Sequence, residues 1–172
     1  MGEIADLREH LDRYRAVTLL HFDLLSEEEF TWRPRPDAFT CGQQLLHIIQ
    51  TEDCFARGLF DDDWQLDRLR FPKPQPSKED LRQLFVNVRA ETLRHLNRLR
   101  DADLDAVKRH GFATVEATVR SWLWFILEHE IHHKAQLSEY LRMLGKVPPY
   151  FAMVLPDLMR PDLQARADLG GV

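Results

Sequence analysis

Residues 122–145 read WLWFILEHEIHHKAQLSEYLRMLG, and this stretch predicts one long amphipathic helix with histidines set into its apolar face. Its apolar residues recur at the spacings i, i+3, i+4 and i+7, which are typical of a helix that faces a protein core. We expect the helix to begin at Thr118 or Ser121. Gly145 should end it, because glycine favours the backbone conformation that follows many helices and because two prolines come shortly afterwards.

Two histidines of this helix, His129 and His133, are four residues apart, so both imidazoles leave the same face one turn apart. Two imidazoles placed in this way can bind one metal ion, and few other roles call for such a pair inside an apolar stripe. His132 lies three residues after His129 and can replace His133 in the pair. The spacing leaves this choice open.

Amphipathic patterns predict three more helices, at residues 3–25, 40–59 and 77–100. The arginines of the third helix alternate with acidic residues, so we expect them to form a solvated face: Arg82, Arg89, Arg94, Arg98 and Arg100. Residues 60–76 contain the sequence FPKPQP and form a connection that is long for a helical bundle. Such loops are often functional, and we expect this one to cover part of one bundle end.

The chain shows no strand pattern and no internal repeat. Four long amphipathic helices joined by loops predict an all-α fold, namely a four-helix bundle with a long loop between the second and third helices. A chain of 172 residues forms one domain by the usual relation between length and domain number. We therefore expect a single domain over residues 1–172, with its core at 3–149 and a C-terminal tail at 150–172 that contains one short helix.

The composition argues against several classes of partner. A net charge of −5 and a pI near 5.9 do not suit a nucleic-acid surface, which needs a basic patch. No apolar run approaches the roughly 20 residues that span a bilayer, and the charged start of the chain does not resemble a signal peptide. Cys41 and Cys54 fall about 20 Å apart along one predicted helix, too far for a disulfide. Two free thiols suit a reducing compartment, and we expect a cytoplasmic protein.

A third imidazole, His47, lies between two pairs of aliphatic residues in the helix predicted at 40–59. Together with the pair on the last helix it predicts a three-histidine site for one divalent ion. Three protein ligands leave one or more coordination positions open, which is typical of a catalytic site rather than a closed structural one. Imidazole suits several divalent ions, so the ligands alone do not select the metal. We expect Zn²⁺ or Ni²⁺ first, with Mn²⁺ or Fe²⁺ as further options.

The sequence resembles the DinB/YfiT-like superfamily. The similarity lies in the LLH segment that ends at His47, in HEIHHKAQLSEYLRMLG at residues 129–145, and in WRPRPDAFT at residues 32–40. It covers most of the chain, about residues 7–149. The chain has Lys134 and Ala135 where the family often has Arg-Gly, a departure that leaves the ligand positions unchanged.

The resemblance implies a four-helix bundle with a non-sequential helix order, a divalent metal bound by three histidines, and frequent homodimers. The family's ligand positions correspond to His47, His129 and His133, which selects His133 over His132. The resemblance also implies that some members transfer a low-molecular-weight thiol to an electrophilic small molecule. A thiol bound to the ion would be acidified and thereby become nucleophilic.

Three residues near the pair are candidates for orienting groups or for proton exchange in such a reaction: Glu130, Gln136 and Tyr140. Gln136 lies three residues after His133 and seven after His129, so it shares the metal-facing side of the helix. We prefer for Gln136 the role of a partner to an imidazole N–H group.

Two other interpretations remain. In the first, the protein is not an enzyme: the metal braces the bundle, or the bundle binds a small ligand without converting it. A fourth protein ligand to the metal, such as Cys54, would favour the structural brace.

In the second, residues 129–133 read H-E-x-x-H, the motif of a metallohydrolase in which Glu130 would be the general base. The hydrolase needs a further ligand downstream, and no histidine follows His133.

Overall fold

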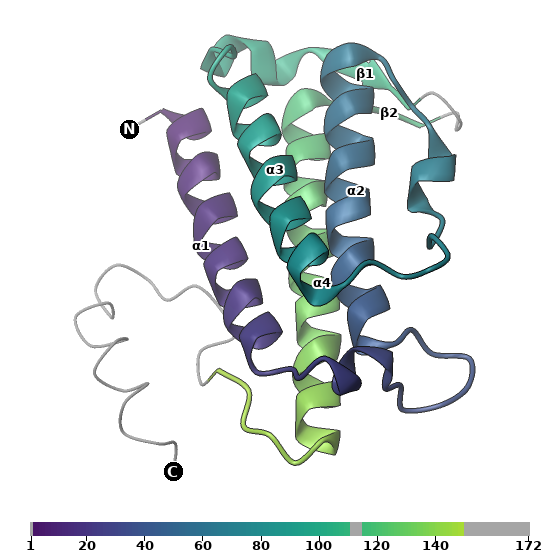
Figure 1. Ribbon diagram of the computed structural model, residues 1–172. Coiled ribbons are helices and arrows are strands. Elements are labelled where there is room, and N and C mark those ends of the chain that lie inside the picture. The colour runs from purple at the N-terminus through teal and green to yellow at the C-terminus, as the bar shows by residue number, and fades with distance from the viewer. Residues whose placement is uncertain (1, 111–114, 150–172) are drawn as a thin grey trace, which may run out of the picture.

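The computed structural model describes residues 2–110 and 115–149, and these form an all-α bundle (Figure 1). The four predicted helices are confirmed as α1 (Glu3–Asp23), α2 (Cys41–Asp61), α3 (Lys78–Leu96) and α4 (Val119–Met143). The first and third end a few residues earlier than expected. Short 3₁₀ helices lie in the connections, at Glu28–Thr31, Leu66–Leu69 and Asp101–Asp105. The short helix expected within residues 150–172 lies outside the described residues.

The starts of α2, α3 and α4 follow from side-chain capping. The Thr40 hydroxyl accepts a hydrogen bond from the Gln43 backbone N–H (3.1 Å), and the Gln43 side chain accepts one from the Thr40 N–H (2.9 Å). Ser77 caps α3 in the same way. Of the two starts expected for the last helix, Thr118 is correct, because its hydroxyl accepts from the Ser121 N–H at 3.1 Å. Each cap satisfies a backbone donor that the first helical turn leaves unpaired.

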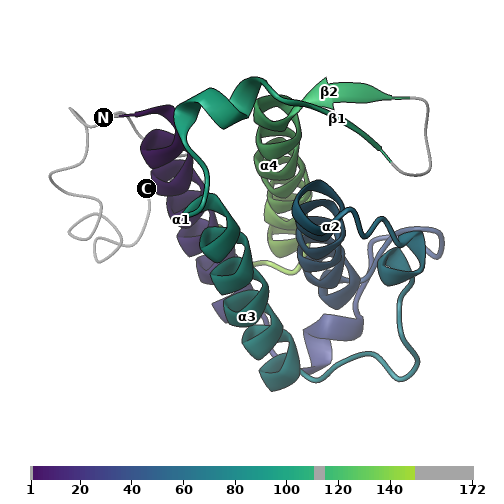
Figure 2. The same cartoon turned by 90° about the horizontal axis from the view of Figure 1, so that it is seen from above.

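The helices are arranged in a non-sequential order. α4 packs between α1 and α2, and α3 lies against α2, as the view along the bundle shows (Figure 2). The consecutive helices α2 and α3 run in the same direction, so their connection must return along the length of α2 (Figure 1). The connection therefore runs alongside α2 rather than lying only over one bundle end. It is fastened there by a hydrogen bond from the Gln50 side chain to the Arg70 carbonyl (2.8 Å).

One prediction about secondary structure is wrong, because the chain does contain a small sheet. Strand β1 (Val107–Arg109) pairs in antiparallel fashion with β2 (Glu116–Thr118), with Val107 opposite Thr118. Both strands are short and mostly exposed, so they carry no alternation of apolar and polar residues that a sequence pattern can reveal. They form where the chain reverses direction before it enters α4.

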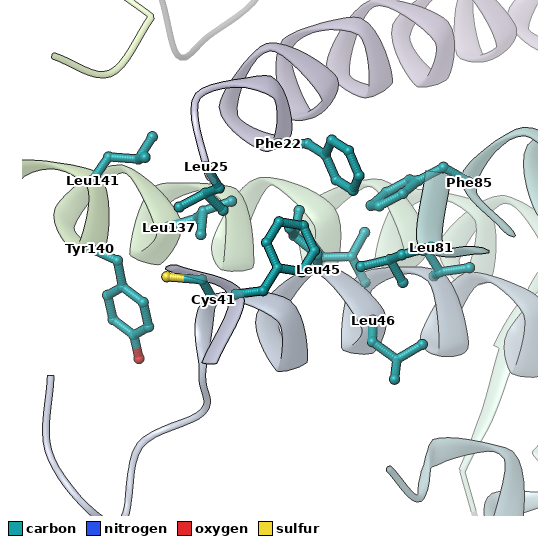
Figure 3. Packing of buried hydrophobic residues seen from close by; sticks show 13 residues of the cluster. Phe22, Leu25, Cys41, Leu45, Leu46, Leu81, Phe85, Leu137, Tyr140 and Leu141 are labelled. Carbon is teal, nitrogen blue, oxygen red and sulfur yellow. The ribbon is translucent and has the colours of Figure 1, made fainter. Parts of the chain in front are cut away.

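The apolar core is divided into two clusters along the bundle. One cluster joins the end of α1 to the start of α2 and the end of α4, and includes Phe22, Leu45, Phe85 and Leu137 (Figure 3). The other cluster lies toward the opposite end and includes Leu11, Leu59, Leu96 and Leu123. Both cysteines are buried and free, as the sequence predicts. Within the described ranges, no helix has the length and apolar content that crossing a bilayer requires.

Candidate metal centre

The structure brings together the three histidines that the sequence singles out. His47 comes from α2, and His129 and His133 come from consecutive turns of α4. One ring nitrogen from each lies within 4.8 Å of the other two. The ring centroids are separated by 4.4 to 4.9 Å. The site therefore depends on the packing of α2 against α4, because neither helix carries all three groups.

The geometry fits a divalent ion. His47 Nε2 lies 3.3 Å from His129 Nε2. Two nitrogens bound at about 2.0–2.1 Å to one tetrahedral ion lie about 3.3 Å apart. Among the described residues, the buried His47 Nδ1 has no hydrogen-bond partner. The donor set and the spacing of these nitrogens both suit a metal ion held between the two helices.

The three imidazoles are held in their neutral form, which is the form that binds metals. Burial, together with charge repulsion from the neighbouring histidines, lowers the pKa of His129 to about 3. Burial and the same repulsion lower the pKa of His133 to about 4, and burial lowers the pKa of His47. At neutral pH each ring therefore offers a lone pair rather than a positive charge.

Two glutamines orient His133. Its Nδ1 donates to the Gln44 side-chain oxygen at 2.7 Å, with the Gln136 side-chain oxygen 3.1 Å from the same nitrogen. Gln44 in turn donates to the Gln136 oxygen (3.0 Å) and to the Tyr140 hydroxyl (3.3 Å). A proton on Nδ1 leaves Nε2 of His133 with the free lone pair. Gln136 thus has the position of an imidazole partner that the sequence suggests.

Gln44 was not identified from the sequence. It is buried, with only 3% of its surface exposed, and it lies three residues before His47 on the same face of α2. This three-residue spacing from His47 is the sequence signal by which Gln44 could have been identified. Hydrogen-bond partners of metal-binding histidines fix the tautomer and the ring orientation, and their loss typically weakens metal binding by about 10–100-fold.

We therefore expect Gln44→Met to weaken divalent-ion binding by about 10–100-fold, because His133 would lose the acceptor that holds its Nδ1–H. The measurement is a competition titration against a chromophoric chelator. Gln83→Met is the matched control, because Gln83 is exposed on α3 and bonds to its exposed neighbour Asn87. Equal affinity of the two variants would contradict the orienting role of Gln44.

Aromatic side chains surround the histidines. Phe39, which precedes α2, and Phe71, from the connection between α2 and α3, both meet the His47 ring edge to face. Phe125 of α4 lies 6.1 Å from His129 between ring centroids. The long connection thus contributes directly to the surroundings of the site. An ion here would have both these aromatic rings and the polar partners of His133 beyond its ligands.

Two other sequence candidates lie apart from the cluster. His132 is exposed and accepts a hydrogen bond from the Gln136 amide at 3.0 Å. Cys54 belongs to the apolar cluster at the far end, and its thiol donates to the Gln65 carbonyl at 3.6 Å. Among the described residues, the ligand group contains neither of them. Cys54 therefore does not supply the fourth ligand that a structural brace would use.

Glu130 lies elsewhere as well. Its carboxylate is 2% exposed and accepts hydrogen bonds from Arg15, Thr18 and Arg89, which are on α1 and α3. Although burial alone would raise its pKa, the charges on Arg15 and Arg89 hold the pKa of Glu130 below its ordinary value. A carboxylate so engaged is not placed to take a proton at the histidines. The H-E-x-x-H interpretation therefore lacks its general base in this geometry.

Glu130 is part of a cluster of four buried charges, one from each helix, which we call the buried quartet: Arg15, Glu52, Arg89 and Glu130. Each is only 2–6% exposed. Burial alone would raise the pKa of Glu52, but Arg89 and Arg15 lower it to about 2. The expectation that Arg89 belongs to a solvated face is wrong, because its guanidinium donates to Glu52 at 2.8 Å inside the bundle. Two arginines and two glutamates balance in charge, which makes their joint burial possible.

Comparison with known proteins agrees with this architecture. The sequence profile of the DinB superfamily matches residues 10–137, a span that contains all three histidines. The uncharacterized protein YjoA of Bacillus subtilis (strain 168) is 24% identical over 137 residues, which cover 79% of this chain and 87% of YjoA.

Solved structures share the fold. The crystal structure of the DinB-like protein YjoA from Bacillus subtilis superposes with a TM-score of 0.65 at 22% identity, covering 88% of this chain and 96% of that one. A DinB-like protein from Bacillus cereus ATCC 10987 gives 0.68 at 19% identity, with 83% and 93% covered. A conserved protein from Enterococcus faecalis gives 0.67 at 17% identity, with 85% and 99% covered. Since the family profile spans most of the chain and its bundle is shared with these proteins, the chain belongs to the DinB superfamily.

Proposed function

We propose that this protein is a metal-dependent enzyme that transfers a low-molecular-weight thiol to an electrophilic small molecule. The observation that carries the proposal is the convergence of three neutral imidazoles, His47, His129 and His133, between two helices. Within the described ranges, the ligand group has three members and no fourth. Three protein ligands are the number found in catalytic rather than structural zinc sites.

The donor set suits Zn²⁺ or Ni²⁺ first, and Mn²⁺ or Fe²⁺ as further options, because imidazole binds all of them and geometry decides among them. A divalent ion held by these histidines would supply an open position at which a thiol or a water is acidified. A thiol suits this site as cosubstrate, because Glu130 is engaged by Arg15 and Arg89 and because the ordinary pKa of a thiol, about 8.5, is already close to neutrality.

The side chains around the site support this chemistry. Gln44 and Gln136 hold His133 in the tautomer whose Nε2 can act as a ligand. Phe39 and Phe71 place apolar rings against His47. The thiol proton would leave to solvent. The thiolate sulfur would then form a bond to the electrophilic carbon, whose leaving group departs with the bonding electron pair.

The proposal predicts that turnover requires both the metal and an added thiol. The assay follows consumption of 1-chloro-2,4-dinitrobenzene, from which chloride leaves, with cysteine, glutathione or coenzyme A as the thiol. We expect a rate above the uncatalysed reaction with the reloaded protein and one of these thiols. We expect that rate to fall to background after chelation and to return with the ion. Undiminished turnover by metal-stripped protein would contradict the proposal, and turnover with water alone would point to a hydrolase instead.

A non-catalytic metal brace is the second candidate, and one observation favours it. The three ligands come from α2 and α4, so an ion would cross-link two helices that are far apart in sequence. A brace would raise thermal stability when metal is added, and it would show no thiol-dependent turnover with any electrophile. The metal-stripped and reloaded proteins used in the turnover assay therefore distinguish the thiol transferase from the metal brace.

A further inference from the structure

The buried quartet lies at the level of the histidines along the bundle. On each helix its member falls between residues of the two apolar clusters: Arg15 between Leu11 and Phe22, Glu52 between Ile49 and Cys54, Arg89 between Phe85 and Leu96, and Glu130 between Leu127 and Leu137. The core is therefore interrupted by one layer of charge. That layer lies at the same level of α4 as the candidate metal centre, because Glu130 directly follows His129.

Within the quartet, single donor atoms bridge the two carboxylates. Arg89 Nη2 donates to Glu52 Oε2 and to Glu130 Oε2, at 3.0 Å in each case. Arg15 Nη2 donates to the same two oxygens, with 3.1 Å to Glu130. The carboxylates belong to α2 and α4, and the arginines belong to α3 and α1. Two outer helices thus hold the two metal-binding helices together through directional bonds.

The glutamates are adjacent in sequence to atoms of the site. Glu52 follows Thr51, whose hydroxyl lies 3.4 Å from His129 Nε2. A rotation or slide of either helix that moved its glutamate would move its histidine as well. Metal sites tolerate ligand displacements of only a few tenths of an ångström, whereas apolar packing has no directional preference that would hold such a position.

We propose that the buried quartet is a positioning device for the metal centre, fixing the relative register of α2 and α4 so that His47 meets His129 and His133. The inference rests on the proposed metal site. The four charges act through the histidines and are positioning residues. Replacing a buried, balanced charge cluster by apolar residues commonly preserves a fold, which separates this role from simple stabilisation.

The test uses Co²⁺, whose visible absorption reports ligand geometry. The main variant replaces all four members by methionine, R15M/E52M/R89M/E130M. We expect it to remain helical by circular dichroism, to bind Co²⁺ about 10–100-fold more weakly, and to show a changed absorption spectrum at saturation. Leu11→Ala is the matched control. It removes core packing one turn before Arg15, and it should keep the wild-type Co²⁺ spectrum.

A second variant covers the case in which the fourfold variant does not fold. Arg89→Lys keeps the charge but removes the planar fork that bridges both carboxylates, so we expect a shifted Co²⁺ spectrum here too. Wild-type affinity and spectrum in the fourfold variant, or in Arg89→Lys if that is the only folded one, would overturn the positioning role and leave the proposed function standing. A wild-type protein that binds no Co²⁺ would remove the proposed metal site, and this inference with it.

Discussion

Replacing His47, His129 or His133 by alanine is expected to reduce the divalent metal content from about one ion per chain to a small fraction of that value. Each substitution removes one of three ligands from a site that two helices share. Loss of an outer hydrogen-bond partner alone typically costs about 10–100-fold in affinity, so loss of a ligand should cost more than about 100-fold. Mass spectrometry of tag-free protein, reloaded with Zn²⁺, Ni²⁺ and Mn²⁺ in separate samples, measures the content.

His132→Ala is the matched control for this experiment. His132 is the neighbour of His133, but it is exposed and bonds to Gln136. We expect this variant to retain the ion. If His132→Ala lost the metal while His133→Ala kept it, the assignment of the third ligand would be wrong. A wild-type protein that remained empty after reloading would mean that these histidines are only polar residues of the bundle.

Thermal unfolding provides a second measurement of the same site. An ion that binds only the folded protein stabilises it by about 4 kcal/mol at a thousand times its Kd. For a chain of this size that corresponds to a rise of roughly 8–16 °C in Tm. We expect this rise in the wild type and in His132→Ala, and no rise in the three ligand variants. Equal rises in all of the proteins would indicate binding somewhere else on the chain.

Arg89→Met is expected to lower the free energy of unfolding by about 3–5 kcal/mol, a large part of the roughly 5–15 kcal/mol that holds a typical domain together. The physical reason is that Glu52 and Glu130 would stay buried with Arg15 as their single remaining arginine in the quartet. Unfolding in urea, followed by circular dichroism, measures the loss. Arg94→Met is the control on the same helix, because Arg94 is exposed and pairs with the partly exposed Glu91, and we expect a far smaller change.

The charge balance of the quartet gives this prediction a sharper form. The double variant E52M/R89M removes more hydrogen bonds than Arg89→Met alone, yet it leaves the neutral pair of Arg15 and Glu130. We therefore expect the double variant to be more stable than the single one. A double variant less stable than Arg89→Met would show that the number of bonds, rather than the balance of buried charge, determines the stability of this layer.

Much of the architecture was predictable because it is local. The four helices follow from apolar periodicity, and the starts at Thr40, Ser77 and Thr118 follow from caps that operate within one turn. The shared face of His129 and His133 follows from helix geometry alone. These features require only residues close in sequence, so the sequence contains the information for them.

The features that sequence reasoning missed depend on contacts between distant segments. Arg89 was assigned to the surface because a charged residue is normally exposed, and its burial is tolerable because Glu52 and Glu130 on two other helices pair with it. Gln44 gains its role from His133, which is 89 residues away. Glu130 follows His129 in sequence, yet it bonds with α1 and α3.

The sequence by itself determined the helices, their caps and the pair of imidazoles on one face, because backbone hydrogen bonding and the 3.6-residue period act over a few residues. The tertiary structure alone decided that α4 packs between α1 and α2, and that four separated charges meet in one buried layer beside His47 and His129. The physical reason is that the partner of a helix face is selected by burial and charge balance over the whole molecule, and no local pattern encodes that choice.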